Sequence, residues 1–282
     1  MTDKRKQRHA MGWVLVFFLG CDLAFLFLIL FFRFGLYNTR FLAAAFEESG
    51  YYSEQETLME EQFQELLSEA ELSELLEFES FRDAFEREMR NQVYGRQGEV
   101  PELTASSIAA AIEGKLDELG LNERSLLAEG GILLFSEDLG TMFHETGQIP
   151  GVASFWESER ALERTAPLLL GALCAVFLAG SGFLFFLRKR RRKYLKLLGA
   201  ALAVGSLIYL PAAGILAGYL LGLFGATREG MASVLLFCGN EAVMELYRAS
   251  VFMAGAVIGG AGLLGAAFAA LAGRLLRSEN RA

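Results

Sequence analysis

The sequence predicts an all-α membrane protein with four transmembrane helices and a predominantly helical extracytoplasmic domain between helices 1 and 2. Three observations lead to this fold class. Hydrophobic residues make up 53% of the 282 residues, which is above the usual share in soluble domains. They fall into four blocks, each long enough to cross the ~30 Å hydrocarbon core of a bilayer. The basic residues gather in three short clusters, whereas the acids gather in one long segment between the first two blocks.

The charge distribution predicts the orientation of the spans. Clusters at Lys4–Arg8, Arg188–Lys196 and Arg274–Arg281 hold 14 of the 26 basic residues. Short loops rich in Lys and Arg stay on the cytoplasmic side, so both termini are expected there. Residues 38–165 contain 28 acids and 9 basic residues, a net charge of −19, and are expected outside. That segment has no cysteine, which is more typical of a bacterial envelope protein than of a eukaryotic secreted domain. We therefore expect a bacterial plasma membrane protein.

The chain divides in order into alternating polar and apolar segments. The first span is longer than the apolar region of a cleaved signal, so it is expected to remain as an anchor despite a weak cleavage-like Ala43–Ala45. The third span is over-long and contains Pro211, so a kink or an interfacial extension is expected. The segments are a basic tail (1–10), the first span (11–34), the acidic domain (38–165), the second span (167–187), a basic turn (188–193), the third span (194–224), a short outer segment (226–248), the fourth span (249–273) and a basic tail (274–282).

Helical periodicity runs through much of the acidic domain. Apolar residues recur at steps of three and four from Met59 to Ala70, from Phe78 to Met89 and from Ile108 to Leu116. Thr104 is the expected N-cap of the third of these helices, and Asn240 is the expected N-cap of a helix that runs into the fourth span. Each stripe should form the buried face of one helix.

Glycine and proline mark the expected breaks in this domain. Asn91–Pro101 is predicted to be a loop, and Gly130–Gly131 is predicted to end a short helix. The segment from Gly140 to Gly151 should be rich in loops. Ile132–Phe135 lies between these breaks, and it fits either a brief strand or a buried helical turn.

One acid interrupts the first span. Asp22 lies midway along it, where a carboxylate costs about 2.5–3.5 kcal/mol on insertion scales. Ser206 and Tyr209 lie in the third span at about the same membrane depth as Asp22, so they are its expected hydrogen-bond partners. Asp22 is then an ion or proton site, a contact for a partner's helix, or a neutral acid that fixes helix packing.

Small residues recur every four positions in the third and fourth spans, which lets helix backbones approach closely. The pattern favours packing within one bundle, with an interface to a second copy or a partner as the alternative. The residues of this pattern are Gly214, Gly218, Gly222, Gly255 and Gly259.

The acidic domain contains one Glu-rich run and one histidine. Twelve Glu and no Lys or Arg occur from Glu47 to Glu79, which is typical of a solvated helix face. A cationic peptide, a polyamine or a loosely bound divalent cation is the alternative interpretation. His144 and the acids near it match no catalytic or zinc-binding spacing, so a surface or structural histidine is expected.

Six consecutive cations separate the second and third spans. Besides setting the topology, a juxtamembrane cluster of this kind can bind anionic lipid headgroups. Its members are Arg188, Lys189, Arg190, Arg191, Arg192 and Lys193.

The order of segments is similar to that of permease subunits of the FtsX/MacB type of ATP-driven machine. Residues Arg192–Ala200, Arg-Lys-Tyr-Leu-Lys-Leu-Leu-Gly-Ala, resemble the charged stretch ending in Gly-Ala that those proteins present to an ATPase. The resemblance implies a permease subunit that works with a partner ATPase. The sequence departs from that family in its short Glu-rich outer domain and in the near absence of a polar coupling helix before the third span.

The residues themselves favour a non-enzymatic multi-pass protein whose outer domain binds or braces an envelope partner. A transporter or permease subunit is the alternative, favoured by Asp22, by Pro211 and by the layout. The expected partners are the lipid bilayer and a membrane or envelope protein, with a second copy of the chain as a further candidate. No cofactor, metal or nucleic acid is expected, because no motif for binding one occurs.

Overall fold

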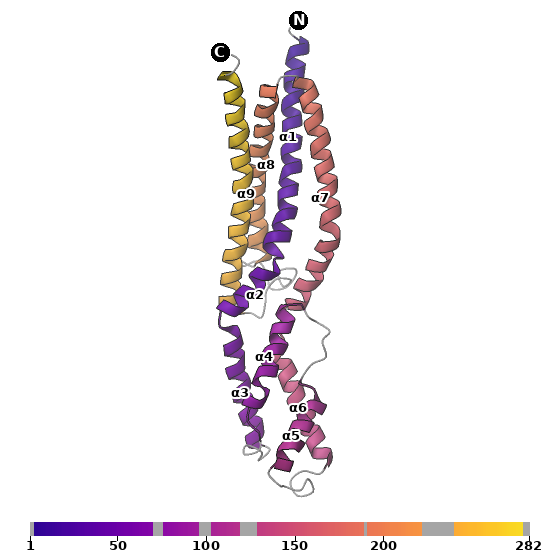
Figure 1. The fold of residues 1–282 in the computed structure, drawn as a ribbon, viewed down its shortest axis with the longest axis vertical. Coiled ribbons are helices and arrows are strands. Elements are labelled where there is room, and N and C mark those ends of the chain that lie inside the picture. The colour runs from indigo at the N-terminus through magenta and orange to yellow at the C-terminus, as the bar shows by residue number, and fades with distance from the viewer. Residues whose placement is uncertain are drawn as a thin grey trace. The chain divides into compact units, whose positions relative to one another are not determined.

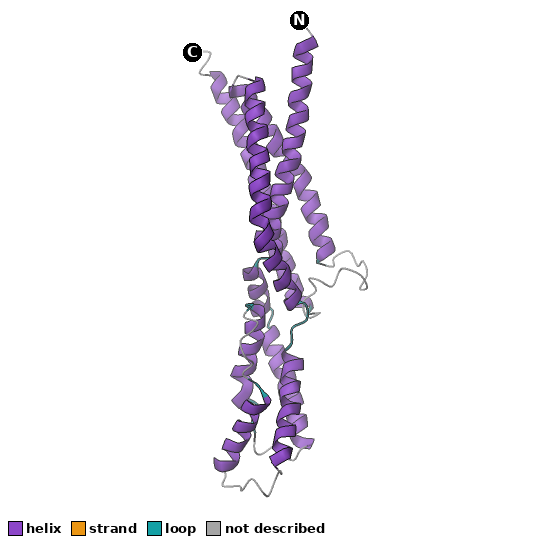
Figure 2. Cartoon of the chain, turned by 90° about the vertical axis from the view of Figure 1, so that its right-hand side faces the viewer, coloured by secondary structure: helices purple, strands orange, loops and turns teal. Residues whose placement is uncertain are grey.

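The computed structural model describes residues 3–69, 76–95, 103–118, 129–188, 191–221 and 240–278. Every regular element in these ranges is helical (Figure 2), which confirms the predicted all-α class. The chain forms two compact units. Unit 1 contains Met1–Phe41, Ser154–Leu235 and Tyr247–Ala282, and unit 2 contains Leu42–Ala153 and Leu236–Leu246.

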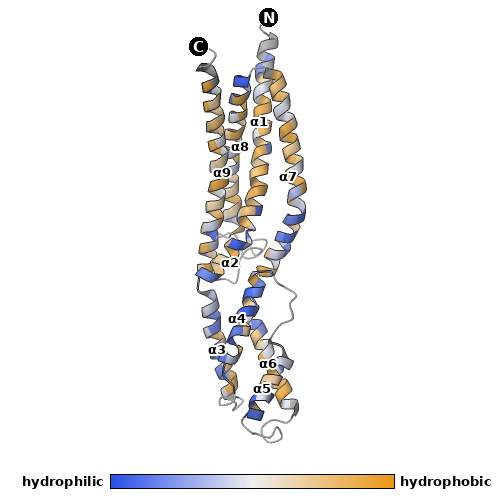
Figure 3. Ribbon diagram, viewed as in Figure 1, coloured by the Kyte–Doolittle hydropathy of each residue, from blue (hydrophilic) through white to orange (hydrophobic). Residues whose placement is uncertain are grey.

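The long helices of the chain are α1 (Asp3–Phe31), α7 (Val152–Arg188), α8 (Arg191–Leu220) and α9 (Glu241–Ser278). A π-helical turn, η1 (Phe32–Leu36), follows α1 directly. Figure 3 shows apolar colour along most of each of these helices, and polar colour in the N-terminal part of α7. Four helical stretches are long and apolar enough to cross a membrane, as predicted: His9–Glu48, Val152–Leu187, Arg191–Leu220 and Glu241–Leu275.

Close backbone approach joins α1 to α8. A Cβ added to Gly205 would lie 2.8 Å from Leu23 Cβ and 3.0 Å from the backbone oxygen of Gly20. One turn further on, Tyr209 packs edge-to-face on the rings of Phe27 and Phe31 at 5.8 and 6.3 Å. Contacts therefore advance in the same direction along both helices, so α1 and α8 run parallel.

Helix α9 packs antiparallel to α8 on a line of glycines. The position of a Cβ on Gly255 is 3.2 Å from the ring of Phe31, and a Cβ on Gly259 would collide with Leu210. Nearer the C-terminus, Gly273 faces Arg192 and Lys196 at the start of α8. Gly255 and Gly259 therefore both lie at close contacts within the bundle.

The other glycines of the predicted pattern behave differently. Nothing lies within 4 Å of a Cβ built on Gly214, so this residue makes no close helix contact within the chain. Gly218 is buried, and Gly222 lies outside the described residues. Sequence analysis missed Gly20 and Gly205, because neither has another glycine four residues away.

Helix α7 runs antiparallel to α1. The site of a Cβ on Gly180 is 2.8 Å from Leu19 Cδ2, and Leu184 joins a core cluster with Val16 and Leu19. The hydroxyls of Ser181 and Tyr194 are 2.6 Å apart, which ties the end of α7 to the start of α8. The starts of α1 and α8 and the ends of α7 and α9 therefore share one end of the bundle (Figure 1).

Unit 2 is built on an aromatic core. It contains most of α2 (Thr39–Glu48) together with α3 (Tyr51–Glu69), α4 (Glu79–Val93), α5 (Ala105–Glu118) and α6 (Glu129–Gly147). The apolar residues of the predicted stripes from Phe78 to Met89 and from Ile108 to Leu116 are buried as expected. In the first stripe, Met59, Phe63 and Leu67 are buried and Leu66 is half-buried, whereas Ala70 lies outside the described residues. The ring of Phe143 lies 5.7–6.4 Å from four other rings, those of Phe63, Phe78, Phe81 and Phe85.

Both predicted N-caps are present. Thr104 Oγ1 accepts a hydrogen bond from the backbone N–H of Ser107 at 3.2 Å, and Ser107 Oγ accepts one from the N–H of Thr104 at 3.0 Å. Asn240 Oδ1 accepts from the N–H of Val243 at 3.1 Å. Each cap satisfies an N–H that has no partner within its own helix.

Helix α6 overturns the predicted breaks. Residues 132–135 are helical, and Gly130, Gly131, Gly140 and Gly147 all lie within α6. Two of these glycines permit close packing instead of a turn. The position of a Cβ on Gly140 is 3.6 Å from the backbone N of Ala105, and that on Gly147 is 3.0 Å from the ring of Phe85.

The helices also extend past two predicted boundaries. Helix α7 continues without a break from Val152, so residues 154–165 belong to unit 1 and not to the acidic body. Helix α8 begins at Arg191, so the last three cations of the basic run form its first turn. Residues 236–246, placed by sequence in a separate outer segment, belong to unit 2.

Substitution of Gly205 by alanine should destabilise the bundle by about 1–3 kcal/mol, because the added methyl group meets backbone atoms of α1. Gly214→Ala is the matched control in the same helix. It has free space and should be neutral or stabilising by about 0.5–1 kcal/mol through helix propensity. Denaturant titration of the full chain in detergent measures both, and equal effects would contradict the packing described above.

Candidate functional site

Asp22 is a buried acid that has no hydrogen-bond partner among the residues that the structure describes. Its side chain is 8% exposed in the bundle, and Oδ2 makes no hydrogen bond to any described residue. The predicted bonds to Ser206 and Tyr209 are absent. The Tyr209 hydroxyl donates instead to the carbonyl of Gly255 at 3.1 Å, and the buried Ser206 Oγ has no partner in the described part of the chain.

Helix geometry explains why the predicted bonds do not form. Leu23 and Gly20 of α1 face Gly205 of α8, and each residue turns the helix by about 100°. Asp22 therefore points to one side of the α1–α8 contact. Ser206 and the ring of Phe27 both lie against Gly262 of α9. The prediction used only the depth of Asp22, Ser206 and Tyr209 along their helices, and depth alone does not give the direction in which a side chain points.

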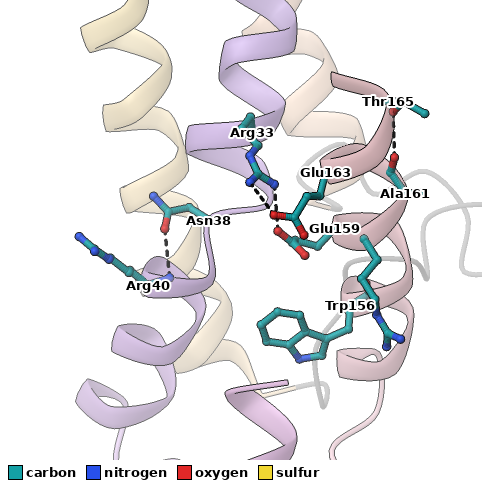
Figure 4. Close-up of polar contacts among 9 residues, drawn as sticks. Arg33, Asn38, Arg40, Trp156, Glu159, Ala161, Glu163 and Thr165 are labelled. Atoms are coloured by element: carbon teal, nitrogen blue, oxygen red, sulfur yellow. Dashed lines mark hydrogen bonds and ion pairs between the residues drawn. The ribbon is translucent and has the colours of Figure 1, made fainter. Parts of the chain in front are cut away.

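A second group of polar residues lies at the end of the bundle where α1 finishes. Arg33 of η1 lies between two acids of α7 (Figure 4), with Nη1 3.0 Å from Glu159 Oε1 and Nη2 3.2 Å from Glu163 Oε1. Glu159 is the more buried of the two acids, with 14% of its side chain exposed. The pairs join segments more than 120 residues apart in sequence.

Two residues of α9 complete this polar collar, which consists of Arg33, Glu159, Glu163, Tyr247 and Arg248. The hydroxyl of the fully buried Tyr247 donates to the carbonyl of Leu36 in η1. Arg248 donates from Nε and Nη2 to the carbonyl of Leu221, at 3.1 and 2.8 Å. Both carbonyls are at helix ends, where the helix itself supplies no partner.

The π-helical turn places Arg33 and Leu36 for these contacts. The N–H of Tyr37 bonds to the carbonyl of Phe32 at 2.8 Å, a step of five residues. Such turns are rare and often occur at functional sites. A Cβ added to Gly35 would lie 3.0 Å from the ring of Phe31, so glycine permits the close approach of the turn to that ring. Sequence analysis did not single out Arg33, which lies near the end of the predicted first span.

In unit 2, arginines from α4 offset part of the Glu-rich run. Arg82 pairs with Glu60 at 3.2 Å, and Arg90 pairs with Glu47. The run has no cation of its own, so sequence alone did not reveal these pairs. Burial, followed by the charge of Glu86, raises the pKa of the Glu56 carboxyl, and the charges of Arg82 and Arg90 partly oppose this rise.

Two clefts flank α6 in unit 2. One has a volume of about 550 Å³ and includes Glu88, Glu137, Glu145 and His144 in its lining. The other, of about 430 Å³, includes Glu65, Asp138 and again Glu145. Neither cleft is lined by Lys or Arg. His144 is exposed, and no group of three His, Cys, Asp or Glu among the described residues is arranged to hold a metal ion.

The predicted basic cluster is described in part. Arg188 ends α7, and Arg191, Arg192 and Lys193 begin α8, whereas Lys189 and Arg190 lie outside the described residues.

These features define the class of molecule: an all-helical chain with four helices able to cross a membrane. No protein-family model matches the sequence, and no curated protein and no solved structure matches it.

Replacing Tyr247 with phenylalanine should lower the free energy of unfolding by about 1–3 kcal/mol, because it leaves the buried Leu36 carbonyl without a partner. Tyr209→Phe is the control. Its acceptor, Gly255, lies inside α9, where the helix also bonds the carbonyl, so the loss should be nearer about 0.5–1 kcal/mol. Chemical unfolding in one detergent compares the two, and a larger loss for Tyr209→Phe would contradict the collar.

Asp22→Asn should not lower the free energy of unfolding, because Oδ2 has no hydrogen bond to a described residue to lose and a neutral amide costs less to bury than a carboxylate. Ser206→Ala provides a second test of the same kind. A drop of more than about 1 kcal/mol for Asp22→Asn would show that Asp22 bonds to the protein after all.

Proposed function

We propose that this chain is a non-enzymatic multi-pass protein of a bacterial plasma membrane, with both termini in the cytoplasm. Its acidic helical unit lies on the outer side, where it binds or braces an envelope partner. The observation that carries the proposal is the uneven distribution of charge over the fold.

The bundle supports the proposed orientation. The first turn of α8 is basic, and Arg274 lies near the end of α9, at the same end of the bundle. Positively charged flanks favour the cytoplasmic side. The chain leaves unit 1 at Phe41 in α2, beyond the end of α1, and re-enters it at Ser154 near the start of α7. Both points lie at the end of these helices away from the basic end, which supports an outer position for the acidic unit.

The surface of unit 2 supports a binding role. The ion pairs made by Arg82 and Arg90 neutralise only part of an acidic surface that rests on a core of phenylalanines. A stable scaffold that carries an excess of exposed carboxylates attracts cationic or polar partners. The larger cleft beside α6, with Glu88, Glu137 and Glu145, is the best-shaped place for such a contact.

A permease or transporter subunit with the FtsX/MacB-like layout is the alternative. Asp22 favours it, since an acid buried among spanning helices without a protein partner is typical of ion and proton paths.

Cysteine labelling tests the orientation. In a chain whose native cysteines are replaced by serine, a membrane-impermeant maleimide applied to intact cells should label Glu61→Cys, which is exposed on α3. The same reagent should fail to label Lys193→Cys until the cells are opened. The reverse pattern would invert the topology and place the acidic unit in the cytoplasm.

Cross-linking in intact cells followed by purification in mild detergent tests the binding role. We expect an envelope protein to be captured in stoichiometric amount by the wild type and lost with Glu137→Gln/Glu145→Gln. Glu61→Gln is the control, because Glu61 is exposed on α3 and lines neither cleft. If an ATPase is captured in stoichiometric amount both by the wild type and by Glu137→Gln/Glu145→Gln, the result would support the permease alternative instead.

A further inference from the structure

The basic end of the bundle is the end at which α8 begins and α7 and α9 finish. Three of its cations come from two different helices: Arg192 and Lys196 from α8, and Arg274 from α9. In sequence they are about 80 residues apart, so only the fold brings them together.

Gly273 allows α8 and α9 to pack closely where these cations lie. A Cβ on Gly273 would lie 3.4 Å from Lys196 Cγ and 3.7 Å from the backbone oxygen of Arg192, so α8 and α9 touch at this level. Arg192 and Lys196 are four residues apart and share one face of α8. Arg274 follows Gly273 directly, which places a third cation at the same junction.

No protein group neutralises these charges within the described residues. Lys196 and Arg274 are exposed, Arg192 is half-buried, and none of them forms an ion pair with another described side chain. Like charges held together repel, so the site favours an anion that can be shared among them.

The apolar side chains around these cations indicate which kind of molecule carries the anion. On α9, Leu271 and Leu275 flank Arg274 and are 53% and 69% exposed. They continue a lipid-type surface that includes Leu264 and Phe268, also widely exposed. An anion here would therefore have apolar chains beside it, as the headgroup of a phospholipid does. The contact between Ser181 and Tyr194 fixes the start of α8, so the site does not have to be assembled on binding.

We propose that Arg192, Lys196 and Arg274 form a binding surface for the phosphate of an anionic phospholipid, whose acyl chains lie along Leu271 and Leu275 of α9. Juxtamembrane basic clusters attract such lipids with about 1 kcal/mol per cation. The proposal goes beyond the function proposed above and does not depend on which side of the membrane the basic end faces.

The test is the relative association of spin-labelled phosphatidylglycerol and phosphatidylcholine with the full chain in phosphatidylcholine bilayers. The wild type should prefer phosphatidylglycerol, and Lys196→Gln/Arg274→Gln should reduce that preference by roughly fivefold or more. The preference should also decline at high salt, where charges are screened.

Arg160→Gln/Arg164→Gln is the matched control, because it removes the same charge from the N-terminal part of α7, at the far end of the bundle. This control should keep the preference, and circular dichroism should show unchanged helix content in both variants. If the first variant does not fold, Arg192→Gln alone should still lower the preference. An equal loss in the control, no loss in the variants, or full competition by free inorganic phosphate would overturn the proposal.

Discussion

The close approach of α1 and α8 at Gly20 and Gly205 is the constraint on which the bundle depends. With no side chain at either position, the two backbones come nearly into contact. This contact sets α1 and α8 parallel and places Tyr209 between Phe27 and Phe31. Helix α9 then packs over Tyr209, because Gly255 and Gly259 leave room for it. The gathering of cations at one end follows from the same arrangement.

Local patterns predicted the elements well, and the failures share one cause. The stripe from Phe78 to Met89 and the caps at Thr104 and Asn240 depend on residues within one helix, so sequence was sufficient to find them. Gly140 and Gly147 were taken for breaks because glycine lowers helix propensity. In α6 that cost is offset by packing against α5 and α4, which involves residues distant in sequence.

The same distinction separates the predicted from the missed polar residues. Asp22 was found because an acid in an apolar run is visible without any structure, whereas its bonding could not be found because it depends on the rotation of α1 against α8. The collar escaped notice because Arg33, Glu159 and Tyr247 look ordinary in their own segments. They become informative only when the π-turn and the antiparallel α7 bring them together.

The bundle is thus held in different ways along its length. At the collar, hydrogen bonds and ion pairs satisfy the polar groups, and along the middle the helices are joined mainly by apolar packing and by small residues. Asp22 and Ser206 are exceptions in this middle region, since each buries a polar atom without a partner in the described chain. A carboxylate at such a depth costs about 2.5–3.5 kcal/mol, and packing contacts of other residues do not reduce that cost. It must therefore be offset by a proton, by an ion or by a group from another helix.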